Sequence, residues 1–314
     1  MLMHRYLNIL LIPILLSLLT ACSGATSTSD TGQQRLNVVA TTGQIADTVA
    51  NVGGDQIELI TLLGPGIDPH SYVPTEGNMT TLQNAQVIFY NGLHLEARMD
   101  RVLQQIGQSG NVTVVAVAET LPASSLLSWE PEAGMPYDPH VWNDVRLWMQ
   151  VTETIHDTLA AADPTHAEIY AANAAVYIEQ LQILHNDIQA AVSQIPQERR
   201  VLVTAHDAFG YLGQAYGFVV EAVQGISTET EASTADIQAL ASLVVERQVP
   251  AIFIETTISP RTIEAVQAAV QAAGHEVKLG GELFSDALDE PGTPAGTYIG
   301  MMRHNTDTIV AALR

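Results

Sequence analysis

Short apolar runs alternate with segments of helical periodicity along most of the chain. Apolar runs bounded by glycine or polar residues predict buried strands, whereas apolar positions spaced three and four residues apart predict amphipathic helices. In the first half the predicted strands are 36–42, 57–63, 86–90 and 112–118, and the predicted helices are 44–52, 75–84 and 95–106. Such alternation is typical of a parallel sheet with helices on both faces.

The alternation resumes after Pro196, where we predict strands 201–205, 218–223, 251–255 and 276–279 and helices 208–216, 234–247, 259–273 and 297–313. Between the halves lie a helix at 145–162 and a longer one at 164–193, which at 1.5 Å per residue is about 45 Å long. The predicted fold class is therefore α/β, with lobes at 36–163 and 196–314 joined by one long rigid helix within 164–195. The segments 64–75 and 121–140 are predicted to be irregular loops.

The first residues combine Arg5 with an apolar run from Leu7 to Leu19, which is typical of a secretory signal peptide and short for a membrane-spanning helix. Cys22 follows directly after Leu-Thr-Ala and is the only cysteine, so the chain has no internal disulfide. Leu-x-Ala-Cys at this position resembles the lipobox of bacterial lipoproteins. We therefore expect a signal peptide at 1–21, lipid attachment at Cys22 and a flexible tether at 22–35, with the protein anchored to the outer face of the cell membrane.

The composition is strongly acidic, with 12 basic and 34 acidic residues and a formal net charge of −22. A chain of this charge is unsuited to a phosphate backbone, so we expect no nucleic-acid partner. The charge is compatible with attraction of cations and equally with simple solubility. A hydrophobic fraction of 47% is ordinary for a globular protein and argues against disorder.

The tripeptide Asp-Pro-His occurs twice, ending at His70 and at His140, each time in a proline-rich loop. Proline restricts its own backbone and that of the preceding residue, so each histidine is presented on a stiff turn. His206 ends a predicted strand and Asp286 follows another, and the carboxyl ends of strands are where α/β folds bind ligands. Three histidines and one carboxylate make a plausible four-ligand metal site, although the spacing alone does not show that they meet.

Seven segments together resemble the solute-binding lipoproteins of zinc and manganese ABC importers, the family that includes TroA-like and ZnuA-like proteins. They are ATTGQIAD at 40–47, GPGIDPHSYVPT at 64–75, NGLHLE at 91–96, DPHVWND at 138–144, TAHDAFGYL at 204–212, GISTETEAS at 225–233 and LFSDAL at 283–288. They follow the family order over nearly the whole chain beyond the tether.

The resemblance implies two lobes with a metal ion between them, held by His70, His140, His206 and Asp286. It also implies capture of a divalent metal ion outside the membrane and its delivery to the permease subunits of an ABC importer, without enzymatic activity. The third ligand is histidine in zinc-binding and TroA-like members and glutamate in typical manganese-binding ones. The long histidine-rich loop of many ZnuA-like members is absent, which favours the TroA-like branch.

Three imidazoles and one carboxylate suit Zn²⁺ in a tetrahedral site, and Mn²⁺ is the alternative cargo. Two other functions stay open at this point. The first is a surface adhesin with a structural metal ion. The second is a zinc-dependent hydrolase, which is disfavoured because four protein ligands leave no open position for a catalytic water and no His-Glu-x-x-His helix is present.

Overall fold

The computed structural model describes residues 35–130 and 135–314, which form one compact unit. The expected signal peptide, the lipid-attachment residue Cys22 and most of the tether lie outside the described residues. No helix among the described residues is both long enough and apolar enough to cross a bilayer.

The N-terminal lobe is built on a four-stranded parallel sheet in the order β2-β1-β3-β4. Its side chains alternate between two cores, so that Val38 and Phe89 contribute to one cluster and Val39 and Ile88 to another. Helices cover both faces, as the sequence predicts. The strands are β1 (Leu36–Ala40), β2 (Ile57–Thr61), β3 (Val87–Tyr90) and β4 (Thr113–Ala116), and the helices are α1 (Gly43–Gly53), α2 (Glu76–Asn84) and α3 (Asp100–Gln108).

The C-terminal lobe contains two parallel strand pairs, β7–β8 and β9–β10, with β7 packed beside β9. A third hydrophobic cluster, which includes Val203 and Ile252, fills the space between these strands and their helices. The strands are β7 (Val201–His206), β8 (Val219–Gln224), β9 (Ala251–Glu255) and β10 (Lys278–Leu283), and the helices are α6 (Gly210–Tyr216), α7 (Thr234–Glu246), α8 (Arg261–Ala272) and α9 (Tyr298–Leu313).

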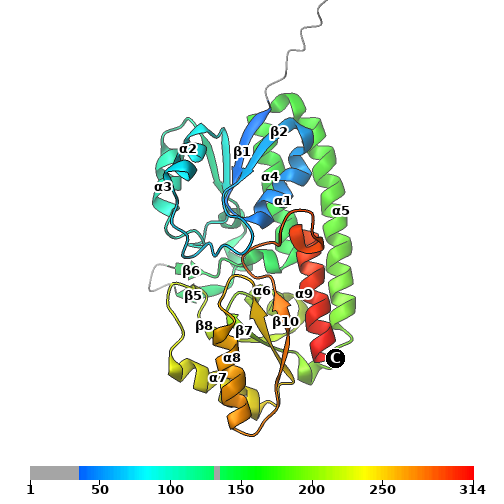
Figure 1. The fold of residues 1–314 in the computed structure, drawn as a ribbon. Coiled ribbons are helices and arrows are strands. Elements are labelled where there is room, and N and C mark those ends of the chain that lie inside the picture. Colours follow the sequence, from blue (N-terminus) through cyan, green and yellow to red (C-terminus); the bar gives the residue numbers. More distant parts are fainter. Residues whose placement is uncertain (1–34, 131–134) are drawn as a thin grey trace, which may run out of the picture. The chain divides into compact units, whose positions relative to one another are not determined.

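The 26-residue helix α5 (Ala167–Val192) links the lobes, and α4 (Val145–Ala162) packs beside it in the N-terminal lobe. The long helix runs beside both lobes and packs against α1 and α4 of the N-terminal lobe and, further along its length, against α9 of the C-terminal lobe (Figure 1). The largest hydrophobic cluster follows these helices from Val38 of β1 to Phe253 of β9. Because one continuous core connects the lobes, their relative position is held by packing as well as by chain connectivity.

Three local predictions differ from the structure. The segment 121–140 is not wholly irregular, because β5 (Ser128–Glu130) and β6 (Met135–Tyr137) pair as an antiparallel hairpin whose strands are too short to show a periodicity. The helix predicted at 95–106 begins only at Asp100. The strand predicted to end at residue 279 continues to Leu283 through a register shift at two glycines.

Packing explains the glycines within β10. A β-carbon at Gly280 would lie 2.5 Å from the ring of Phe253, and Gly281 has a φ of 132°, which side chains rarely adopt. The glycines therefore mark an irregularity inside the strand and not its end. The longer strand carries the chain directly to the loop that contains Asp286.

Candidate metal centre

The four predicted ligands come from four separate segments. His70 lies in the loop between β2 and α2, and His140 precedes a 3₁₀ turn at Val141–Asn143. His206 is the last residue of β7, and Asp286 lies in the loop after β10. Three of the four, His70, His206 and Asp286, therefore lie at or beyond the carboxyl end of a parallel strand, which is the edge where open α/β sheets bind their ligands.

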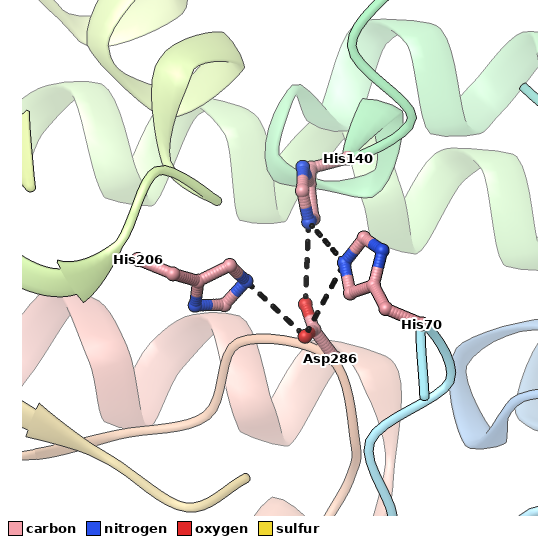
Figure 2. Close-up of side chains that lie close together, drawn as sticks. All are labelled: His70, His140, His206 and Asp286. Atoms are coloured by element: carbon pink, nitrogen blue, oxygen red, sulfur yellow. Dashed lines mark hydrogen bonds and ion pairs between the residues drawn. The ribbon is translucent and has the colours of Figure 1, made fainter. Parts of the chain in front are cut away.

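The structure brings these four side chains together, with one candidate ligand atom from each lying within 4.8 Å of the others. The Nε2 atoms of His70 and His140 are 3.3 Å apart, and Nε2 of His206 is 3.2 Å from Oδ2 of Asp286 (Figure 2). Oδ1 of Asp286 is 3.5 Å from Nε2 of His140. All four residues are at most 1% exposed.

Each Asp-Pro-His sequence folds into the same turn. The carboxylate of Asp68 accepts a hydrogen bond of 2.9 Å from the backbone N–H of His70, and that of Asp138 accepts one of 2.9 Å from the backbone N–H of His140. An aspartate that bonds the backbone two residues further on is a local turn-forming contact. The sequence motif itself therefore supplies the turn that presents each histidine.

Two carboxylates orient the imidazole rings from outside the cluster. Oδ1 of Asp138 lies 2.8 Å from Nδ1 of His140, and Oε2 of Glu255 lies 2.6 Å from Nδ1 of His206. A carboxylate at Nδ1 holds the ring proton there, so the lone pair of Nε2 is presented to the centre of the cluster. Sequence reasoning missed Glu255. The available signal was an acidic residue at the end of the buried apolar strand β9.

Burial and neighbouring charges shift the pKa values of the cluster residues in different directions. Burial lowers the pKa of His70 to about 3, so this imidazole is neutral at neutral pH. Burial also opposes the charged form of His206, but Glu255 and Asp286 outweigh it and raise the pKa of His206 well above its ordinary value. Burial would raise the pKa of Asp286, but the histidines, His206 foremost, hold it well below the usual range. In the metal-free cluster the charged form of His206 is thus favoured beside the Asp286 carboxylate, and a metal ion that binds there would displace the proton from Nε2.

Unpartnered atoms show that the cluster is suited to a cation. Nε2 of His206 and both carboxylate oxygens of Asp286 are buried without a hydrogen-bond partner among the described residues. Such groups are costly to bury unless something satisfies them. The shorter contacts between ligand atoms, 3.2 to 3.8 Å, are close to the edge of about 3.3 Å that four ligands 2.0 Å from a tetrahedral zinc ion would have.

The other histidines within the described residues do not join the cluster. His94 faces Asp100 at 3.2 Å, and His304 contacts the backbone oxygen of Glu282 at 3.0 Å. Trp142 is buried, its ring packs edge-on against His140, and its indole N–H donates to the backbone oxygen of Ser285. Trp142 therefore belongs to the hydrophobic core and also lines the metal site beside His140.

The fold and the cluster are those of a two-lobed binding protein for a metal ion, and comparison with known proteins gives the family. The sequence profile of the zinc-uptake complex component A family, a periplasmic component, matches residues 38–312. The chain belongs to this family, the metal-binding solute-binding proteins of ABC importers. Family members bind and carry metal ions and are not enzymes, which removes the hydrolase alternative.

Individual relatives differ in the metal that they are named for. The chain is 48% identical over 276 residues to the zinc-binding protein TroA of Treponema pallidum, covering 88% of each chain. It is 43% identical over 296 residues to the manganese-binding lipoprotein MntA of Bacillus subtilis, covering 94% of this chain and 95% of the relative. The solved structure of the Treponema TroA superposes with a TM-score of 0.86 over 89% of this chain and 99% of that one.

Proposed function

We propose that this protein is an extracytoplasmic binding protein that captures a divalent metal ion and delivers it to the permease of an ABC importer. His70, His140, His206 and Asp286 are the proposed ligands. The observation that carries the proposal is the convergence of four buried side chains on one small volume, in which the ligand atoms of His206 and Asp286 have no hydrogen-bond partner among the described residues. Membership of the importer family supports the delivery step.

We favour zinc as the cargo because three imidazole nitrogens and one carboxylate oxygen form the donor set that zinc prefers. Manganese is the alternative, and one feature of the site supports it. Oδ1 of Asp286 faces His140 while Oδ2 faces His70 and His206, so both oxygens point into the cluster. A carboxylate that binds through both oxygens would supply a fifth donor and suit a metal ion of higher coordination number.

A competition titration tests the cargo. Metal-free protein is titrated with Zn²⁺ and with Mn²⁺ at pH 7.5 in the presence of a chromophoric chelator, and we expect one ion bound per chain and tighter binding of zinc. His206→Ala should weaken zinc binding by at least 100-fold, whereas His156→Ala, on the surface of α4, should leave it unchanged. Tighter binding of manganese would overturn the choice of zinc, and equal behaviour of the two variants would overturn the site.

Delivery to the permease is tested in cells. A strain that lacks the gene should lose high-affinity uptake of radioactive zinc, and the intact gene should restore it. The His206→Ala gene should fail to restore uptake although the protein is made and exported in normal amounts. Restored uptake with this variant would refute the role of the site in import.

A further inference from the structure

The segment 138–144, which contains His140, is tied to the opposite lobe by buried hydrogen bonds. The indole N–H of Trp142 donates to the backbone oxygen of Ser285 at 3.0 Å, and the side-chain amide of Asn143 donates to the backbone oxygen of Ala208 at 2.9 Å. Trp142 and Asn143 are fully buried. Bonds of this kind are costly to break because each partner would be left unsatisfied in the interior.

These bonds connect three of the four proposed ligands. Ser285 directly precedes Asp286, and the backbone N–H of Ala208 donates to the backbone oxygen of His206 at 3.0 Å. His140, His206 and Asp286 therefore belong to one internally bonded block, although they come from both lobes. A small opening of the lobes around α5 would have to break these buried bonds before it could separate the three ligands.

The fourth ligand is held differently. His70 lies in the loop 64–75, in which only Pro69 and His70 are buried and in which Val73 is 61% exposed. Among the described residues, one hydrogen bond joins this loop to the C-terminal lobe, namely the bond of 2.6 Å from Oγ1 of Thr228 to Oδ2 of Asp68. Oδ1 of the same aspartate accepts the backbone N–H of His70. The hydroxyl of Thr228 is thus connected to the His70 turn through a single carboxylate.

We propose that Thr228 is a positioning residue for His70, and that the loop 64–75 is the part of the site that opens when the metal ion leaves. While the hydroxyl of Thr228 bonds Asp68, the His70 imidazole is held against the other three ligands. When this bond breaks, the loop moves outward and removes one ligand, while the other three keep their geometry. His70 is then the last ligand to bind and the first to leave. This inference rests on the proposed function of the site.

A neighbouring contact between the lobes provides the matched control. Glu229, the next residue after Thr228, forms an ion pair of 3.3 Å with Arg98, and both side chains are about half exposed. Ion pairs exposed to this degree contribute little. The Arg98 contact does not reach the His70 turn, so its loss should not affect the ligand.

The test measures how fast Zn²⁺ leaves the loaded protein when it is mixed with excess chelator in a stopped-flow instrument. Thr228→Val keeps the shape of the side chain and removes the hydroxyl, and we expect release to become about 10-fold faster, as for loss of a hydrogen bond to a charged group. Thr228→Ser restores the hydroxyl and should release zinc at close to the original rate. Glu229→Gln should change the rate by less than 2-fold.

A second pair of variants separates positioning of His70 from a general role in holding the lobes together. In a His70→Ala background the added Thr228→Val change should have no further effect on zinc release. An equal acceleration in both backgrounds, an unchanged rate in Thr228→Val, or an acceleration accompanied by a matching loss of stability in the metal-free protein would each overturn the proposal. Wild-type protein that binds no divalent metal ion would instead refute the proposed function, and this inference with it.

Discussion

Glu255→Gln is the substitution whose outcome the structure specifies most fully. Oε1 of Glu255 accepts the backbone N–H groups of Ala205 at 2.7 Å and His206 at 2.9 Å, and Oε2 faces Nδ1 of His206 at 2.6 Å. In the variant, the amide oxygen can keep the two backbone bonds only if the NH₂ group takes the place of Oε2. A donor then faces Nδ1, so the neutral imidazole must carry its proton on Nε2.

That tautomer blocks the metal ion, because Nε2 is the nitrogen that points to Asp286. Zinc binding would have to move the proton back to Nδ1, where it would meet the amide NH₂ group. Substitution of such supporting residues typically costs 10- to 100-fold in metal affinity, equivalent to about 1.4 to 2.7 kcal/mol. The free energy of unfolding of the metal-free protein should change less, because the two backbone bonds are kept.

The assay is a chelator competition with Zn²⁺ at pH 7.5, together with denaturant unfolding of the metal-free protein. Glu246→Gln, on the exposed side of α7, is the matched control and should behave like wild type. A zinc affinity within 2-fold of wild type for Glu255→Gln would refute the tautomer argument. Loss of affinity together with an equal loss of stability would assign the effect to packing of β9 against β7.

Two further predictions concern pH and the anchor. Because burial lowers the pKa of His70 to about 3 while the unfolded value is about 6.5, the neutral imidazole favours the folded state above pH 6.5, and this contribution is lost as the pH falls from 6.5 towards 3. Metal-free wild type should therefore lose about 2 to 3 kcal/mol more than His70→Asn between pH 7 and pH 4.5 in denaturant titrations, and parallel curves would contradict the assignment. Cys22→Ser should leave zinc affinity unchanged and release the protein from the membrane fraction after signal cleavage, so a variant that still sediments with membranes would exclude lipid attachment at Cys22.

Local sequence patterns predicted most of the strands, helices and turns, because each of these elements is determined mainly by residues close together in the chain. Alternating apolar runs predicted the four strands of the N-terminal sheet, and the proline and N-cap signals near Asp163 predicted the start of the long helix to within three residues. The Asp-Pro-His turns are equally local, since each aspartate bonds the backbone two residues further on. The helix predicted at 95–106 begins only at Asp100. The buried carboxylate of Glu96 accepts the backbone N–H groups of Asn91 and Gly92 and holds the preceding residues in a turn.

By itself, then, the sequence determined the two-lobed α/β fold, the stiff turns that present His70 and His140, and the family resemblance from which the four-residue set was inferred. Only the tertiary structure decided that these side chains meet, that Glu255 orients His206, and that the hydroxyl of Thr228 bonds the His70 loop from the other lobe. The physical reason is distance along the chain. A turn or a strand is determined by neighbouring residues, whereas the position of Glu255 beside His206 depends on how β9 packs against β7, and no periodicity in either strand encodes that packing.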